Sequence, residues 1–110
     1  MIITILRIVP SPEKLAEVLK AIRTLLEPIR VRPGCLSWHI CQDVDDNNAI
    51  TFIGEWSSRG DLDEHIRSKE YKIVLSLMEM SIEPPKVSFN FVSESKGLEL
   101  VEEIRRASSF

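Results

Sequence analysis

The chain has little basic charge and no long apolar run. Its 14 Lys and Arg residues are outnumbered by 17 Asp and Glu residues, so the formal net charge is -3. A pI of about 5.4 leaves no positive field to attract phosphates, and we expect no nucleic-acid partner. No apolar stretch approaches the roughly 20 residues of a membrane span. The start MIITILRIVP lacks the basic beginning and the small-residue cleavage site of a signal peptide. We therefore expect neither a membrane partner nor secretion.

Cysteine and histidine are also scarce. If Cys35 and Cys41 share one strand, they lie about 20 Å apart at ~3.3 Å per residue, too far for a disulfide with each other. Neither has the spacing of a metal ligand, so we expect no metal site. Two free thiols indicate a reducing, cytoplasmic setting. The only histidines are His39 and His65.

What is present has the composition of a single globular domain. Hydrophobic residues make up 44% of the chain and charged residues 28%, and we treat residues 1–110 as one domain. Alternating and β-branched patterns predict strands, and apolar residues at helical spacing predict helices. The predicted strands cover residues 2–9, 35–42, 49–56 and 86–93, and the predicted helices cover residues 12–29, 57–68 and 70–80.

The order of these elements is βαββαβ, followed by a tail. This order predicts an α+β, ferredoxin-like fold, in which two helices, the second of them in two pieces, cover one face of an antiparallel sheet. In the last strand, the alternation around Asn90 predicts core positions for Phe89 and Phe91.

The predicted sheet is apolar on both faces. In the first strand Ile3 and Ile5 point one way, while Leu6 and Ile8 point the other. Helices cover only one of these faces, so we expect the other to pack against a second copy in a homodimer. The alternative is an ordinary sheet with some exposed apolar residues.

The tail is ambiguous. Leu98, Leu100 and Ile104 fit strand alternation, whereas Leu100, Val101 and Ile104 fit a helix. We predict a short strand followed by a helix. Residues 93–110 would form a C-terminal extension that contacts the other copy of a dimer.

Three local patterns occur in order along the chain. They are PGCLSWH at residues 33–39, QDVDDNNA at residues 42–49, and EWSSRGDLDEHIRS at residues 55–68, followed by KEYK. Together they resemble the antibiotic biosynthesis monooxygenase (ABM) family. Its usual pattern is a PGC-like turn, an acidic hairpin loop, and then E-x-W-x-S-x-x-x-L-x-x-H-x-x-S. The resemblance extends from the first strand to the fourth.

The resemblance implies a dimeric α/β barrel with a pocket between the sheet and the helices of each subunit. Family members include cofactor-independent oxygenases of phenolic, polyketide and quinol substrates, and also heme-degrading enzymes. We therefore predict a cofactor-independent monooxygenase, an oxidoreductase acting on a small aromatic, phenolic or quinol substrate. Because fold does not fix function, the alternative is a non-catalytic dimeric module that binds a small hydrophobic ligand or a protein partner.

Heme degradation is less favoured. Heme-degrading members carry an asparagine late in the first strand, a tryptophan at the position of His65, and an axial histidine near Leu75. Here the first strand ends with Arg7 and Ile8, and no histidine follows His65. Heme iron needs a protein ligand such as His, Cys, Met or Tyr. Besides His65 and the methionines, Tyr71 is the only nearby candidate.

His65 is the best-placed candidate for catalysis. It follows Leu62 by three residues and precedes Ile66, so it lies beside the apolar stripe of its helix. An unperturbed pKa near 6.5 would let it take a proton from a phenol or quinol, which could then pass an electron to dioxygen. Glu55 could orient the imidazole if its strand face meets the helices. Otherwise His65 is a packing residue, and Glu55 bonds an arginine at the dimer interface or the backbone.

Five further residues are candidates for the substrate pocket. The indole N–H of Trp56 or Trp38 could donate to a substrate oxygen, or both could simply pack in the core. The Asn90 amide could hold a carbonyl or dioxygen, and otherwise it must be paired within the protein. The Tyr71 hydroxyl could lie at the pocket mouth. His39 neighbours Trp38 but points to the opposite strand face, so it lines either the pocket or the barrel interface.

Overall fold

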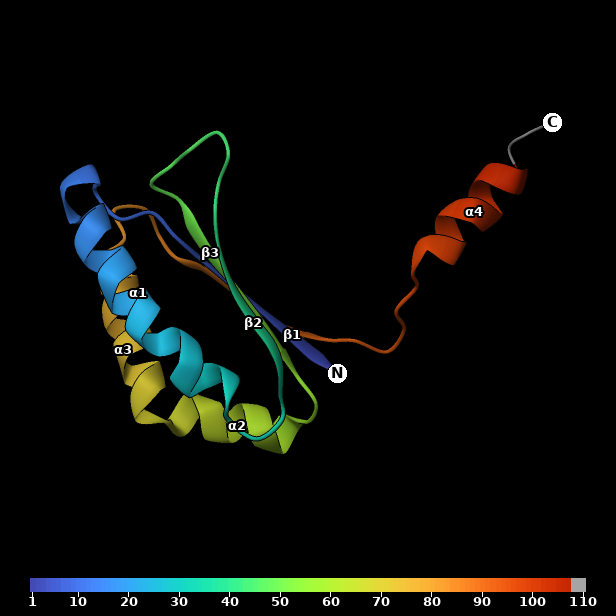
Figure 1. The fold of residues 1–110 in the computed structure, drawn as a ribbon, viewed down its shortest axis with the longest axis horizontal. Coiled ribbons are helices and arrows are strands. Elements are labelled where there is room, and N and C mark those ends of the chain that lie inside the picture. Colours follow the sequence, from blue (N-terminus) through green and yellow to red (C-terminus); the bar gives the residue numbers. More distant parts are fainter. Residues whose placement is uncertain (108–110) are drawn as a thin grey trace.

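The computed structural model of the protein describes residues 1–107 (Figure 1). Four strands and four α-helices follow one another, with a short 3₁₀ turn before the first helix. They are β1 (Ile2–Ile8), η1 (Pro12–Lys14), α1 (Leu15–Arg30), β2 (Cys35–Gln42), β3 (Ile50–Trp56), α2 (Arg59–Arg67), α3 (Lys69–Glu79), β4 (Lys86–Phe91) and α4 (Leu98–Ala107).

The strands form one antiparallel sheet in the order β2-β3-β1-β4. Helices α1, α2 and α3 lie together on one side of it (Figure 1). This confirms the predicted ferredoxin-like α+β fold, with the predicted second helix divided into α2 and α3. None of the helices in residues 1–107 is long and apolar enough to cross a membrane.

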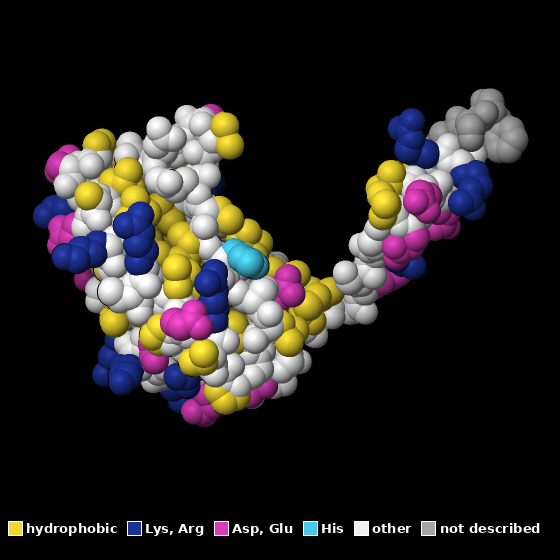
Figure 2. Space-filling model, viewed as in Figure 1, with side chains coloured by type: hydrophobic (Ala, Val, Ile, Leu, Met, Phe, Trp, Pro, Cys, Tyr) yellow, Lys and Arg dark blue, Asp and Glu magenta, His cyan; other side chains and the backbone are white. Residues whose placement is uncertain are grey.

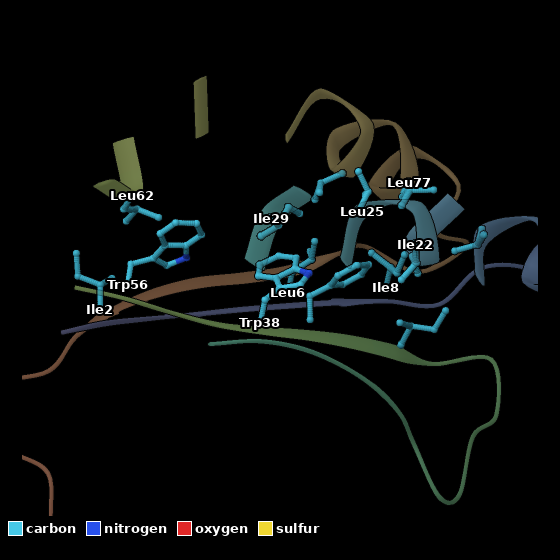
Figure 3. Packing of buried hydrophobic residues seen from close by; sticks show 14 residues of the cluster. Ile2, Leu6, Ile8, Ile22, Leu25, Ile29, Trp38, Trp56, Leu62 and Leu77 are labelled. Atoms are coloured by element: carbon cyan, nitrogen blue, oxygen red, sulfur yellow. The ribbon is translucent and has the colours of Figure 1, made fainter. Parts of the chain in front are cut away.

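The core lies between the sheet and these helices (Figure 3). Alternate residues of β1 and β3 point into it, since side chains alternate between the faces of a strand. A stripe on α1 at helical spacing packs above them. The buried apolar residues from these three elements are Ile2, Leu6 and Ile8, Ile50, Phe52 and Trp56, and Val18, Ile22, Leu25 and Ile29.

The opposite face of the sheet carries the other set of alternating side chains. Ile5 lies directly opposite Ile53 on this face, beside the ion pair between Arg7 and Asp43, whose Nη2 and Oδ2 atoms are 3.0 Å apart. Ile5 is exposed. The face is therefore partly apolar, as the sequence indicated, and the homodimer built on it stays a prediction.

Strand β4 differs from its neighbours because it lies at the edge of the sheet. Phe89 and Phe91 point to the helix side, but α1, α2 and α3 do not extend fully over them. Phe89 is 39% exposed and Phe91 is 59% exposed. The prediction that both residues belong to the core is therefore wrong, because strand alternation identifies a face but not how much of it is covered.

The C-terminal extension is also different from the prediction. The predicted short strand at the start of the tail is absent, because no strand lies between β4 and α4. Helix α4 stands apart from the layered body (Figure 1). The predicted extension ran to residue 110, and its last three residues lie outside the described ones. The predicted contact of this extension with a second copy stays a prediction.

Candidate functional site

The junction between β3 and α2 is fixed by local hydrogen bonds. The Ser58 side chain caps α2 by accepting a hydrogen bond from Asp61 N–H, and the Ser57 and Ser58 hydroxyls both donate to Asp61 Oδ2. Gly34 lies against the Asp61 side chain with φ of 80°, a conformation that glycine adopts without strain. Its carbonyl accepts a hydrogen bond from Ser57 N–H at 2.9 Å. The motif residues between Trp56 and Leu62 thus serve mainly to turn the chain into α2.

Ser68 ends α2 and begins α3. Its hydroxyl donates to the His65 carbonyl oxygen at 2.6 Å and accepts from Tyr71 N–H at 3.2 Å. One side chain therefore caps both helices at the break. The break brings the rings of His65 and Tyr71 edge to face, with centroids 5.2 Å apart.

The His65 imidazole is enclosed by aromatic rings. It stacks on Trp56 with the ring centroids 4.4 Å apart, and meets Trp38 edge to face at 5.6 Å. Trp38 in turn lies over Gly54, where an added Cβ would come within 2.8 Å of the indole. The side chain of His65 is only 1% exposed, and both indoles are buried as well (Figure 3). The strands β2 and β3 thus supply the floor of the site, and α2 supplies the histidine.

Burial sets the protonation state of His65. Burial, and secondarily the positive charge of Arg32, lower the pKa of His65 to about 4, while Glu70 opposes the shift. Arg32 and Glu70 are themselves paired, with Nη1 and Oε2 3.7 Å apart. The imidazole is therefore neutral at pH 7. The expectation of a base with a near-neutral pKa is wrong, because the sequence does not reveal how completely the ring is desolvated.

Three buried nitrogen atoms in the site have no hydrogen-bond partner among residues 1–107. They are His65 Nδ1, Trp38 Nε1 and Trp56 Nε1. A buried polar group without a partner usually marks a missing ligand, a missing water or a functional constraint. These atoms give an otherwise apolar region three polar contacts to offer.

A narrow cavity lies between the sheet and helices α2 and α3, beside His65. Trp38, Phe52 and Tyr71 contribute to its wall, and Phe89 closes it on the β4 side. Its volume is about 20 Å³, which accommodates about one water molecule. Tyr71 is partly buried at this cavity, which raises the pKa of its hydroxyl and keeps it protonated at neutral pH.

The structure separates the other predicted site residues from His65. Glu55 lies opposite Ile3 and Ser37, on the sheet face turned away from the helices. Because Trp56 points inward, its neighbour Glu55 must point outward. The proposed orientation of the imidazole by Glu55 is therefore wrong.

Asn90 and His39 lie on that same outer face. The Asn90 side-chain amide donates to the Ile3 carbonyl oxygen at 3.0 Å and to Ser88 Oγ at 3.1 Å, so the protein itself supplies its partners. His39 lies opposite Ile53 and is exposed. Of the predicted site residues, only Trp38, Trp56, His65 and Tyr71 come together.

Sequence reasoning missed two contributors to this site. Phe89 was predicted to be a core residue, although it forms a cavity wall, and Arg32 was given no role, although its charge lowers the pKa of His65. Alternation placed Phe89 on a different face from Asn90, which is the only signal that could have identified it. No local pattern links Arg32 to a histidine on another element.

Comparison with known proteins gives a consistent assignment. Residues 1–74 match the family model described as antibiotic biosynthesis monooxygenase. An uncharacterized protein of Synechocystis sp. is 26% identical over 89 residues, which are 80% of this chain and 60% of that protein. The chain thus spans less than two thirds of the length of this relative.

Solved structures show the same architecture. The crystal structure of an antibiotic biosynthesis monooxygenase is 26% identical and superimposes with a TM-score of 0.77 over 86% of this chain and 100% of that one. A conserved protein of Methanosarcina mazei Go1 is 27% identical, with a TM-score of 0.75 over 80% of this chain and 88% of that one. Rv0793 from Mycobacterium tuberculosis, at 22% identity and a TM-score of 0.78 over 87% and 98% of the two chains, shares the fold. The family model covers about two thirds of the sequence, and the chain therefore belongs to the antibiotic biosynthesis monooxygenase family.

Proposed function

We propose that this protein is a cofactor-independent monooxygenase of a small phenolic or quinol substrate that binds beside His65. The observation that carries the proposal is the pair of residues with unpartnered nitrogen atoms in the wall of an apolar cavity, His65 with its Nδ1 and Trp38 with its Nε1. A third unpartnered nitrogen, Trp56 Nε1, belongs to the ring stacked on His65. A binding site for a small aromatic molecule combines apolar walls with a few polar contacts that fix orientation. Family membership supports the same class of reaction.

Substrate binding requires the cavity to enlarge. Its volume of about 20 Å³ is far below the roughly 150 Å³ of an apolar cavity that takes up benzene. The β4 wall is the side able to move, because Val87 and Phe89 are exposed at the sheet edge while Trp38 and Phe52 are held in the core. We infer that the substrate enters between β4 and α3.

The role of His65 follows from its protonation state. A phenol has a pKa of about 10, whereas the pKa of His65 is about 4. Full proton transfer across about 6 pKa units would cost roughly 8 kcal/mol, since each unit is worth about 1.4 kcal/mol. We therefore infer that neutral His65 accepts a hydrogen bond from the substrate hydroxyl and orients it. An indole N–H would donate to a second substrate oxygen.

The proposed reaction needs only dioxygen as co-reactant. A quinol and O₂ give a hydroxyquinone and water. One oxygen atom forms a new C–O bond on the ring, and the O–O bond breaks. The other oxygen atom leaves as water with two substrate hydrogens. The substrate supplies all four electrons that reduce O₂, so no flavin or metal enters the balance. The apolar walls would keep bulk water from the reduced oxygen intermediate.

Oxygen uptake with a panel of quinols and anthrones tests this proposal. We expect His65→Ala to lower kcat/KM at least tenfold. The matched control is His39→Ala, which removes the histidine on the opposite sheet face and should leave the rate within about twofold. Uptake that is equal in the wild type and in His65→Ala would refute the role of His65.

A second function, a binding module without chemistry, is favoured by one specific observation. The small cavity and the tight stack of His65 on Trp56, with centroids 4.4 Å apart, are what a packing residue would show. In that case a small aromatic ligand quenches the tryptophan fluorescence, while no oxygen is consumed with any member of the panel.

A further inference from the structure

Helix α4 presents an apolar stripe away from the body of the protein. Leu100, Val101 and Ile104 lie on one side of the helix, Glu102 lies on the opposite side, and Glu103 lies at the margin between them. Leu100 is 39% exposed and Val101 is 50% exposed, and Figure 2 shows hydrophobic side chains gathered on this helix. Helices shorter than ~12–15 residues are marginal in water, and most helical stability comes from packing of the apolar face. A helix of 10 residues therefore needs a surface to pack against.

The body carries an apolar groove of suitable character. It runs between α2 and β4, where Leu62 and Ile66 face Phe89 and Phe91, and its volume is about 230 Å³. The guanidinium group of Arg59 lies over the Phe91 ring, 5.7 Å from its centroid. This groove exists because α2 and α3 stop short of the edge strand. It is an apolar area that the three packed helices do not cover.

We propose that α4 of one copy docks into the α2–β4 groove of a second copy, and that α4 of the second copy docks into the same groove of the first. Strand β4 continues outward beyond Phe91, since Val92 N–H donates to the Met1 carbonyl oxygen at 3.0 Å. The short segment 93–97 then carries α4 away from its own groove (Figure 1). When each of two copies gives its helix and receives the helix of the other, the exchange closes into a two-fold dimer.

Charge supports the same arrangement. Glu103 lies at the margin of the apolar stripe of α4. The side chain of Arg59 at the groove edge is 70% exposed, although it also pairs with Asp63, with Nε and Oδ1 2.9 Å apart. The Glu103 carboxylate of the incoming helix would therefore meet a cation at the rim, where a charge contact fixes orientation more than it adds affinity.

This contact would also complete the candidate site. Phe89 belongs both to the groove and to the wall of the cavity beside His65. A helix from the second copy would cover the exposed edge by which the cavity opens. This consequence rests on the proposed function, but the docking itself does not, and its test does not measure activity.

Disulfide trapping in the full-length chain tests the exchange. In a Cys41→Ser background, one sample carries Ile66→Cys in the groove, and a second, tagged for size, carries Leu100→Cys or Val101→Cys on α4. After mixing and mild oxidation we expect a covalent heterodimer from at least one of the two α4 positions. The matched control is Glu102→Cys, on the polar side of the same helix, which should give at least tenfold less product.

Two results would overturn the proposal. One is equal trapping at the polar and apolar positions of α4. The other is found when one chain carries both Ile66→Cys and the α4 cysteine. An internal disulfide in a monomer, in place of a covalent dimer, would mean that the helix folds back onto its own groove. Hydrogen exchange supplies a second measurement. The α4 amides should gain protection as protein concentration rises, and Val101→Asp should remove that gain while Glu102→Gln keeps it.

Discussion

The buried neutral state of His65 predicts a loss of stability at mildly acidic pH. The pKa of this group falls from 6.5 to about 4 on folding, mainly because burial disfavours the charged ring. The unfolded chain therefore binds more protons than the folded one between about pH 6.5 and pH 4. The stability that depends on a neutral His65 is complete above about pH 6.5 and is lost progressively as the pH falls toward 4.

The size of the effect follows from the shift. A difference of about 2.5 pKa units is worth roughly 3 kcal/mol in full. Between about pH 7.5 and about pH 5, the part that is lost is about 2 kcal/mol. For a domain of this size that corresponds to a fall in Tm of roughly 10 °C. It is a large share of the 5–15 kcal/mol that stabilises a typical domain.

Urea unfolding of the wild type and of His65→Phe at several pH values isolates this contribution. The variant keeps an aromatic ring in contact with Trp56 and lacks the titrating group. Because both proteins contain the same carboxylates and His39, the contributions of those groups to the pH dependence cancel when the two free energies of unfolding are subtracted. We expect the free energy of unfolding of the wild type to fall by about 2 kcal/mol more than that of the variant over this range. A difference that stays constant with pH would refute a buried, neutral His65.

Three further results are expected. Gly54→Ala should destabilise the protein by about 1–3 kcal/mol, because the new Cβ would meet Trp38 and Thr4 at 2.8 Å. Gly60→Ala should instead stabilise it by about 0.5–1 kcal/mol, since its Cβ would meet only Ser58 Oγ at 4.0 Å in the first turn of α2; thermal unfolding that moves both variants in one direction contradicts the packing argument. Ser68→Ala should cost about 1 kcal/mol in urea unfolding by removing the cap shared by α2 and α3, with Ser76→Ala on exposed α3 surface nearly neutral. Arg32→Gln should raise the pKa of His65, because a positive charge that lowers it is removed; NMR titration of the imidazole measures the shift, and an unchanged pKa would contradict it.

The pattern of the sequence was sufficient for most of the fold. Apolar spacing and turn residues identified the four strands and the first three helices, and their order identified the ferredoxin-like topology. The same spacing placed His65 beside Leu62 on the buried side of α2, which the structure confirms. These features are local, and chain order leaves few topologies for them.

Much of the candidate site could not be predicted in this way. Alternation along β3 sorts Glu55 and Trp56 onto different faces, but it does not say which face meets the helices when both are apolar. In the structure Trp56 faces the helices, so Glu55 and Asn90 lie on the outer face of the sheet, away from His65. The shifted pKa of His65 and the effect of Arg32 on it also arise from segments that are distant in sequence.

The sequence by itself determined the elements, their order and the family, because these depend on the spacing of side chains along the chain. The tertiary structure alone decided which residues surround His65, how far its ring is removed from water, and that α4 and the α2–β4 groove are both left open. These features depend on which surfaces meet in space. Contacts between segments that are distant in sequence produce no periodic pattern of residue types, so the sequence alone does not reveal them.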